Sequence, residues 1–540
     1  MTARSCAALI LSFLIAPTFA AVASAHGGPQ SGAMDWPTYG HDLHHTFHGR
    51  TTLNEVTVHL LAPAWYFHTG DAVTANPIVV KGKVYFGSWD GNFYAVDAET
   101  GQEAWPHFAL DPQPAVVPHP QSGNPLTTRQ LVPPDPNELS SDGGLVTSTA
   151  FFQPANPTTG NRDLLIFGGG YTLYALDASN GSLAWKQPYT GLPEQAPDPV
   201  HDEARIFSSP VVVGDKVLFG VTSDGQNGHR GYFVIASLSD GSLVKRFETD
   251  VDGSGNILND GCGGVWSSAT VDETNHLVIF DVADCNFFGN VSGNPYNERV
   301  IALHFGDSSF TDGTLAWTFT PPRLVAADPD CDWDFGATAN LGVDENGVTN
   351  FLGVGGKDGY YYRLNPQNGS LKWQTPVVFG GLAGGFIATT AYDGRRIYGA
   401  TALGDFGRFE GFGEPSLGCQ MPGLNNDMTV RTTVNPADQL IQEPSMHAFD
   451  KRDGDVVWQG ILSQSFGPTT VAGGMTFVGT GVTSQIQIRD ARTGLLVHLL
   501  PLPAASSSGV VVSGDAIYFG TGSSEQGFPD GVYKFSPLGK

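Results

Sequence analysis

The stretch NPIVVKGKVYFGSWDGNFYAVDAETGQEAW, residues 76–105, holds the pattern that decides the fold of this chain. Its apolar residues alternate with a period of two in short segments, which are separated by turns rich in glycine. Such alternation is typical of strands with one buried face, and Gly and Asp turns join strands into antiparallel hairpins. An Asp-x-x-x-Gly turn and Trp105 end the stretch. The stretch therefore predicts an antiparallel sheet followed by one more strand.

The end of this stretch recurs along the chain. A glycine is followed four residues later by a tryptophan at Gly101 and Trp105, Gly181 and Trp185, Gly313 and Trp317, Gly369 and Trp373, and Gly454 and Trp458. Two further turns, at Gly241 and Gly494, have Lys245 and His498 at the tryptophan position. Alternating strand pairs precede the endings, so each repeat is expected to form one four-stranded propeller blade.

An eighth repeat begins near Ser507, and the chain ends before its turn and its tryptophan. The segment LAPAWYFHTG, residues 61–70, contains a spare strand with Trp65 that could complete this repeat and close the ring. We therefore predict an all-β fold, an eight-bladed β-propeller of four-stranded antiparallel blades, over residues 61–540. A tryptophan that recurs at one position of a repeat more often packs blade against blade than binds a ligand, and we interpret these tryptophans as structural.

Charge and the N-terminus restrict the location and the partners. The formal net charge of −26 over 540 residues argues against nucleic acid or an anionic membrane surface as a partner. Residues 1–25 combine Arg4, an apolar segment and an Ala-Ser-Ala cleavage pattern, which predicts a signal peptide. No later run of 18 apolar residues indicates a membrane span. We expect an exported protein, periplasmic or secreted, in which residues 26–60 form an N-terminal segment with exposed loop histidines (His41, His44, His45 and His48).

The repeat resembles the pyrroloquinoline quinone (PQQ) repeat over essentially the whole mature chain. Four stretches are similar to the polyvinyl-alcohol-dehydrogenase-like branch of the quinoprotein alcohol dehydrogenases: DWPTYGHDLHHTFHG (35–49), VWSSATVD (265–272), DWDFGATANL (332–341) and VGGKDGYYYRLNPQNG (354–369). The resemblance implies a PQQ-dependent oxidoreductase. Non-catalytic assembly-factor lipoproteins share the repeat, so individual site positions must distinguish an enzyme from a scaffold.

Blade four contains two of the implied site residues. In the family, a tryptophan at the start of the inner strand stacks on the planar cofactor, and an asparagine eighteen residues later ligates calcium. Here Trp266 is followed eighteen residues later by Asp284. A hairpin brings such positions to one face, and an aspartate keeps an oxygen ligand suited to a hard cation. The alternative is that Trp266 is a core residue and Asp284 a turn residue.

Blade five contains the implied base. The family places an aspartate directly after a tryptophan at this point, and the stretch CDWDFG, residues 331–336, matches it with Trp333 and Asp334. Asp334 is therefore the candidate base, and Trp333 would orient it or form a wall of the cofactor site. Family members that use a lanthanide carry another acid two residues beyond the base. That position is Gly336 here, which favours calcium. Lys357 matches the cation that contacts the quinone oxygens, although an ordinary Lys-Asp-Gly turn would look the same.

Blade three departs from the family pattern. The family has a calcium-ligating glutamate there, before a Gly-x-Arg-Gly, and this chain reads TSDGQNGHRGY. Arg230 lies within the matching Gly-x-Arg-Gly and is a candidate cofactor contact. Asp224 and Gln226 lie near the glutamate position, and either could donate an oxygen to the metal. An acid expected before Pro77 is replaced by Thr74, and this change together with Gln226 favours a scaffold.

The cysteines bear on stability and on electron transfer. The predicted mature chain has Cys262, Cys285, Cys331 and Cys419, which allow three pairings. Cys262 and Cys285 flank the ends of the hairpin that carries Trp266 and Asp284, so a bridge between them is one hypothesis. No Cys-x-x-Cys-His occurs, so no covalent haem is expected. Electrons would then leave through a separate acceptor such as a soluble cytochrome.

Two functions remain open on the sequence alone. The first is an exported PQQ- and calcium-dependent dehydrogenase that oxidises an alcohol, secondary or polymeric, by hydride transfer to the quinone. The second is a non-catalytic PQQ-repeat propeller that acts as a binding or assembly scaffold. The joint presence of Trp266, Asp284, Asp334 and Lys357 favours the enzyme, because blade packing requires none of their polar groups.

Overall fold

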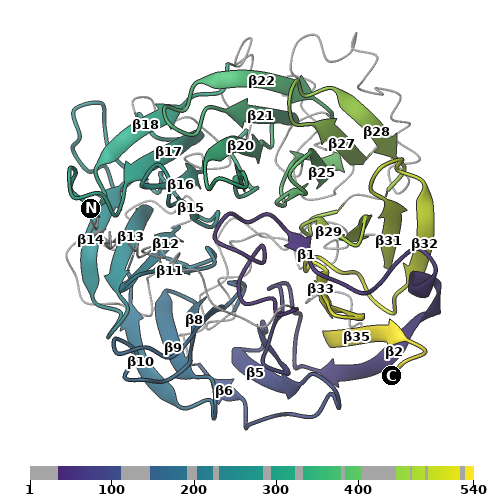
Figure 1. Cartoon of the computed structure of the whole chain (residues 1–540). Coiled ribbons are helices and arrows are strands. Elements are labelled where there is room, and N and C mark those ends of the chain that lie inside the picture. Colours follow the sequence, from purple (N-terminus) through teal and green to yellow (C-terminus); the bar gives the residue numbers. More distant parts are fainter. Residues whose placement is uncertain are drawn as a thin grey trace, which may run out of the picture.

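Eight β-sheets form blades that are arranged radially around a central axis (Figure 1). The computed structural model describes residues 34–110, 146–190, 204–222, 230–283, 294–322, 333–378, 384–403, 445–462, 465–480, 484–522 and 530–540. Each blade is an antiparallel sheet whose first strand lies nearest the axis and whose last strand lies at the rim. The prediction of an eight-bladed propeller of four-stranded blades is therefore confirmed.

Blades one to four follow the sequence in order. From the axis outward, their strands are β3 (Ile78–Val80), β4 (Lys83–Gly87), β5 (Asn92–Asp97) and β6 (Phe108–Ala109); β7 (Phe151–Gln153), β8 (Leu164–Gly169), β9 (Thr172–Asp177) and β10 (Leu183–Pro188); β11 (Val211–Val213), β12 (Lys216–Val221), β13 (Tyr232–Ser237) and β14 (Leu243–Glu248); and β15 (Thr270–Asp272), β16 (Leu277–Val282), β17 (Arg299–His304) and β18 (Leu315–Phe319).

Blades five to seven continue the order. Their strands are β19 (Asn340–Val343), β20 (Thr349–Gly355), β21 (Tyr360–Leu364) and β22 (Leu371–Pro376); β24 (Ala391–Tyr392), β25 (Arg396–Ala400), β27 (Met446–Asp450) and β28 (Val456–Gly460); and β29 (Thr470–Ala472), β30 (Met475–Gly479), β31 (Gln485–Asp490) and β32 (Leu496–Pro501). The short β1 (His48–Gly49) adds to β29 in parallel, and β23 (Gly384–Gly385) pairs with β26 (Ala402–Leu403) outside the blades.

The ring closes by joining the two ends of the propeller. Blade eight consists of β33 (Val511–Ser513), β34 (Ala516–Thr521) and β35 (Gly531–Pro537), and β2 (Leu61–His68) supplies its outermost strand. β2 runs antiparallel to β35, with Trp65 opposite Lys534. The short 3-10 helix η1 (Thr57–Leu60) leads into β2. The prediction that residues 61–70 complete the eighth blade is therefore confirmed.

The recurring tryptophans join each blade to the next. Six indole N–H groups donate to a backbone carbonyl in the turn of the following blade: Trp65 to Ala98, Trp105 to Ala178, Trp185 to Leu238, Trp317 to Pro366, Trp373 to Lys451 and Trp458 to Ala491. The glycine of each of those turns has positive φ, and an added Cβ would come within 2.4–2.6 Å of the indole. Glycine is thus required both by the backbone and by the tryptophan packed on it. These contacts confirm the structural interpretation of the tryptophans.

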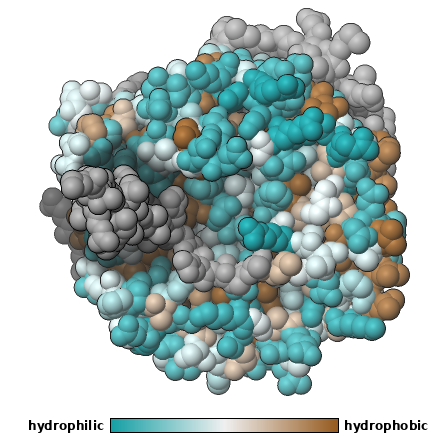
Figure 2. Space-filling model, in the orientation of Figure 1, coloured by the Kyte–Doolittle hydropathy of each residue, from teal (hydrophilic) through white to brown (hydrophobic). Residues whose placement is uncertain are grey.

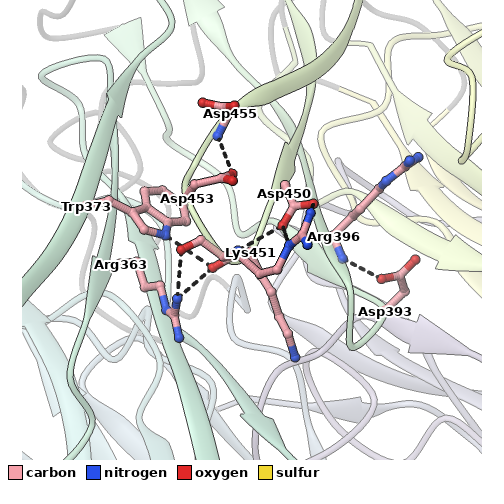
Figure 3. Close-up of polar contacts among 9 residues, drawn as sticks. Arg363, Trp373, Asp393, Arg396, Asp450, Lys451, Asp453 and Asp455 are labelled. Carbon is pink, nitrogen blue, oxygen red and sulfur yellow. Dashed lines mark hydrogen bonds and ion pairs between the residues drawn. The ribbon is translucent and has the colours of Figure 1, made fainter.

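Figure 3 shows one such junction, between blades five and six. The Trp373 indole donates to the Lys451 carbonyl at 3.2 Å, and the Arg363 guanidinium donates to the same carbonyl at 2.9 Å (Figure 3). Asp450, which begins the turn, accepts two hydrogen bonds from the Arg452 side chain. The junction therefore pairs half-buried polar groups as well as burying apolar area.

A belt of polar side chains links the inner ends of the blades. The backbone N–H of one member donates to the side-chain oxygen of the next along a chain of residues: Gly509, Asn76, Thr149, Ser209, Ser268, Thr338 and Thr389. Each member lies two residues before an inner strand, so the belt fixes the relative height of adjacent blades.

Residues 34–52 run across the inner strands rather than forming a separate exposed segment. Backbone hydrogen bonds join Trp36 to Val79, and other members of the segment to blades two and four to eight: Pro37 to Phe152, Leu43 to Val271, His44 to Leu341, Thr46 to Tyr392, Phe47 to Val471 and Thr52 to Gly514. His45 is 0% exposed, and its ring bonds to the Tyr39 and Ala269 carbonyls. The expectation that all four histidines are exposed loop residues holds for His48 alone. His45 is buried and His41 and His44 are half-buried, because this segment packs inside the ring.

The face of the molecule in Figure 2 is largely hydrophilic, and hydrophobic side chains gather at its right-hand edge, where Figure 1 places β32. The exposed apolar side chains of this blade are Leu495, Leu496 and Leu499. An outermost strand has one face toward solvent, which explains their position. Within the described residues, none of the helices is long and apolar enough to cross a membrane.

Candidate functional site

Asp334 lies at the start of blade five, six residues before β19, and is 2% exposed. Trp333, beside it, is also 2% exposed and belongs to the apolar cluster between blades four and five, together with Phe335 and Tyr362. Its burial within this cluster supports a role for Trp333 in orienting Asp334. The described part of the CDWDFG stretch, residues 333–336, therefore runs into the interior of the propeller and is not a surface turn.

Lys357 approaches Asp334 from the turn that follows β20. The Lys357 Nζ lies 3.0 Å from Oδ1 of Asp334, and the Lys357 backbone N–H donates to the Asp334 carbonyl at 2.9 Å. Both side chains are buried, at 9% and 3% exposure. A buried ion pair of this geometry keeps the carboxylate ionised and is screened little by salt.

Trp266, at the start of blade four, is the third residue at this site. Its indole Nε1 donates to Oδ2 of Asp334 at 3.3 Å, and the Lys357 Nζ lies 5.0 Å from the centre of its ring. Trp266 is half-buried, unlike Trp333. Trp266 from blade four and Lys357 from blade five therefore both contact the carboxylate of Asp334. Their roles with respect to a cofactor stay predictions.

Gly336 has no room for a side chain. A Cβ at this position would lie 2.9 Å from the Ile387 Cα and 2.9 Å from Cη2 of Trp266. An acid two residues beyond Asp334 would therefore displace the Trp266 indole from its place beside Asp334.

Asp281, in β16, is a further acidic residue at this site, and the analysis of the sequence missed it. The side chain is 0% exposed, and neither carboxylate oxygen has a hydrogen-bond partner among the residues that the structure describes. Burial, and then the charge of Asp334, raise the pKa of Asp281 well above its usual range. A charged residue inside the apolar run LVIFDV is the sequence signal that could have identified it.

The contacts of Arg230 are with residues other than Trp266, Asp334 and Lys357. It is 6% exposed, its Nε lies 3.4 Å from Oε2 of Glu248, and its Nη1 donates to Oδ1 of Asn259 at 3.3 Å. No contact between Arg230 and Trp266 or Asp334 is found among the described residues. A role for Arg230 in binding a cofactor stays a prediction.

The remaining predicted residues bear on the metal and on the disulfide. Asp224, Gln226 and Asp284 lie outside the described residues, so the predicted calcium ligands stay predictions. Cys262 is disulfide-bonded, and its partner lies outside the described residues. The existence of a bridge at Cys262 is thereby established, whereas its pairing with Cys285 stays a prediction.

The chemistry of these side chains suits a planar anionic cofactor and a divalent cation. The half-buried Trp266 offers a flat ring, and Lys357 offers a positive charge close to that ring. The orphaned carboxylate of Asp281 offers oxygen donors of the kind that hard cations bind. Asp334, held ionised between Lys357 and Trp266, is able to accept a proton.

Comparison with known proteins identifies the family. Residues 36–377 match the profile described as the β-propeller domain of glucose, ethanol and alcohol dehydrogenases, and residues 357–527 match that of the outer membrane protein assembly factor BamB. The first match spans more than half of the chain, so the chain belongs to the PQQ β-propeller dehydrogenase family.

Curated relatives include quinoprotein dehydrogenases. The chain is 25% identical over 466 residues to the dehydrogenase subunit of the quinone alcohol dehydrogenase of Gluconobacter oxydans, with 81% of this chain and 56% of the relative covered. It is 23% identical over 494 residues to a polyvinylalcohol dehydrogenase of a Pseudomonas species, with 79% and 70% covered. The chain spans about half the length of several of the curated relatives it matches.

Solved structures support the fold. A europium-containing methanol dehydrogenase superposes with a TM-score of 0.64 at 15% identity, covering 94% of this chain and 98% of that one. The quinohemoprotein alcohol dehydrogenase of Comamonas testosteroni gives a TM-score of 0.64 at 17% identity, with 95% and 82% covered. At these identities the likeness establishes the architecture only.

Proposed function

We propose that this protein is an exported, PQQ- and calcium-dependent dehydrogenase that oxidises an alcohol, secondary or polymeric. The observation that carries the proposal is the convergence of Trp266 and Lys357 on the buried carboxylate of Asp334. The family membership supports the same reaction class. A scaffold needs no buried ion pair at this point, whereas an alcohol dehydrogenase needs a base held ionised close to its cofactor.

Asp334 is the base of the proposed reaction. Its Oδ1 or Oδ2 accepts the hydroxyl proton of the alcohol while the carbon loses hydride, so that a carbonyl forms and one proton remains on Asp334. Bound PQQ supplies the two-electron acceptor, and calcium supplies a Lewis acid that polarises the accepting carbonyl. Removal of water from around Asp334 strengthens its interactions with Lys357 and with the substrate hydroxyl.

Trp266 and Lys357 bind and orient in this scheme. The Trp266 ring provides a stacking face, and its Nε1–H holds Oδ2 of Asp334 in place. Lys357 offsets negative charge on Asp334 and would do the same for a reduced, anionic quinol. Asp284, with Asp224 or Gln226, would hold calcium, and Arg230 and Trp333 would contact the cofactor or support those that do.

The partners follow from the same proposal. A family reaction that reduces a bound quinone needs an external electron acceptor, and relatives of this chain include a quinohemoprotein alcohol dehydrogenase and a lupanine 17-hydroxylase designated as cytochrome c-linked. We propose a separate soluble cytochrome as the acceptor. The predicted signal peptide supports a periplasmic or secreted location, where such cytochromes and PQQ are accessible.

A scaffold function is the second candidate. It is favoured by the match of residues 357–527 to an outer membrane assembly factor and by the replacements at Thr74 and Gln226. In the structure the Thr74 hydroxyl accepts a hydrogen bond from Nε1 of Trp89 at 2.9 Å, so this position is used in packing.

The experiment that separates the two is a titration of metal-stripped protein with PQQ, with and without calcium. Absorbance reports binding, and dye-linked oxidation of a panel of primary, secondary and polymeric alcohols reports activity. Calcium-dependent PQQ binding with activity supports the dehydrogenase. Absence of PQQ binding under both conditions would refute it and would direct the search to protein partners.

A further inference from the structure

The position of Asp281 in the repeat sets it apart from the other buried acids. Strand register aligns it with one residue in the second strand of every blade, and these residues are Gly87, Gly168, Gly220, Gly355, Ala400, Gly479 and Gly520. Seven blades therefore carry a residue with no side chain or a single methyl group here. All eight positions lie within the described residues.

The small residues have a packing reason. A Cβ at Gly87, Gly168, Gly220, Gly355 or Gly520 would lie 2.1–2.5 Å from a residue at the start of the next blade: Val146, Ile206, Val265, Phe386 and Val73. The polar belt aligns those residues with Phe335 in blade five, the residue after Asp334. The Asp281 side chain therefore enters the junction between blades four and five where the other junctions hold no polar side chain at this position.

Strand alternation gives the same placement. Leu277 and Ile279 share a face of β16 with Asp281, and both pack in the cluster that contains Trp333 and Phe335. Val278, Phe280 and Val282 face blade three instead. The carboxylate of Asp281 thus points from blade four toward the start of blade five.

The Ser267 hydroxyl lowers the pKa of Asp281, but burial and the charge of Asp334 outweigh this effect. The Asp281 backbone N–H donates to Oγ of Ser267, whose own hydrogen is directed at the Asp281 backbone carbonyl. The Lys357 ammonium forms its ion pair with Asp334 and not with Asp281. A buried carboxylate without a partner is costly, and blades that keep glycine here avoid that cost. The negative charge of this buried carboxylate must therefore be neutralised by a bound proton or offset by a cation.

We propose that Asp281 is a direct oxygen ligand of the site's divalent cation, additional to the ligands predicted from the sequence. This inference rests on the proposed function, because the cation is the one that accompanies the cofactor. A hard cation prefers carboxylate oxygens, and both oxygens of Asp281 are available to it. The adjacent Asp334 carboxylate adds to the negative potential that a cation would meet at this junction.

The test measures cation binding directly. Metal-stripped wild-type protein and the variants Asp281→Asn and Asp281→Gly are titrated with calcium by calorimetry, with and without saturating PQQ. Terbium luminescence sensitised by the nearby tryptophans gives a second readout. Glu345→Gln, which changes an exposed acid in the turn between β19 and β20, is the matched control. Asp281→Gly introduces the residue that most other blades have at this position. It is therefore expected to fold even if Asp281→Asn does not.

The proposal predicts calcium affinity weakened by ~10-fold or more in both Asp281 variants, and loss of sensitised terbium emission. Calcium should raise the melting temperature of the wild type and of Glu345→Gln, and raise that of Asp281→Gly less. Unchanged calcium affinity in both Asp281 variants would overturn the proposal, as would a wild type that binds no calcium with or without PQQ. PQQ absorbance is read separately, so failure of the proposed function is distinguishable from failure of this ligand.

Discussion

Trp373 and Trp266 show how one residue type serves two regions of the propeller. At the rim, the Trp373 indole packs on Gly454 and donates to the Lys451 carbonyl, which Arg363 also contacts (Figure 3). At the centre, Trp266 is half-buried and donates to the carboxylate of Asp334.

The two regions differ in whether their buried polar groups have hydrogen-bond partners within the fold. At the rim, the indole N–H of each docked tryptophan has a partner within the fold, and the same contact recurs in six junctions. At the centre of blades four and five, the repeat is broken by an ion pair and by an orphaned carboxylate. A repeat thus builds the scaffold, and departures from it at buried positions mark the site.

The largest effect is expected at the centre, from Asp334→Asn. Loss of the base should lower kcat by about 10²- to 10⁴-fold, because the amide cannot accept the hydroxyl proton. Asparagine has almost the same shape, so PQQ affinity should change little, whereas loss of the buried ion pair with Lys357 should lower the melting temperature. Dye-linked kinetics and PQQ absorbance titration measure the two properties. Turnover close to that of the wild type would remove Asp334 from the role of base.

The next effect is expected at the rim, from Trp373→Ala. This change removes a large side chain packed between two blades and leaves the Lys451 carbonyl with one donor fewer. The free energy of unfolding should fall by about 3–5 kcal/mol, as for other large aromatic deletions. Urea unfolding followed by tryptophan fluorescence measures it, with Trp266→Ala as the comparison. A smaller loss for Trp373→Ala than for Trp266→Ala would break the distinction between the regions.

A buried histidine of the scaffold should give stability a pH dependence that PQQ binding does not share. Burial lowers the pKa of His447 to about 3, while an unfolded histidine titrates near 6.5. The unfolded state therefore binds the proton more readily, and stability is lost as pH falls from about 6.5 toward 3, by about 1.4 kcal/mol per pH unit. His447→Gln, measured by urea unfolding between pH 4 and 7, should flatten this dependence. An unchanged slope would show that other groups cause the acid lability.

The smallest effect is expected where a rim contact is missing. Lys245 takes the tryptophan position between blades three and four, and its Cγ lies 2.8 Å from where a Cβ on Gly313 would be. Lys245→Trp should stabilise the protein by about 1 kcal/mol if the indole packs on Gly313 as it does elsewhere. Thermal unfolding checks this. A lower melting temperature would show that this junction cannot accept the ring.

The fold was predictable because the repeat encodes it locally. Alternation, Asp-x-x-x-Gly turns and recurring tryptophans specify each blade, and the spare strand with Trp65 predicted closure by β2. Residues 34–52 carry no repeat, so nothing local indicated that they cross the inner strands and bury His45.

The site was predictable only in part. Resemblance in short motifs indicated Trp266, Asp334 and Lys357, and the structure brings these three together. Asp281 interrupts an apolar run in the sequence, but only the strand register, aligned across all eight blades, shows that the other blades have glycine or alanine at its position. Arg230 matched a motif, but its neighbours Glu248 and Asn259 come from outside that motif.

The most direct test of this account is a parallel PQQ titration of Trp266→Ala and Trp373→Ala, with calcium present and below the melting temperature of either variant. The account predicts that Trp266→Ala loses PQQ affinity by ~10- to 100-fold, the value of one stacked ring, while Trp373→Ala binds PQQ as the wild type does. PQQ affinity that is unchanged in Trp266→Ala, or lost equally in both variants, would contradict a functional centre set apart from a structural rim.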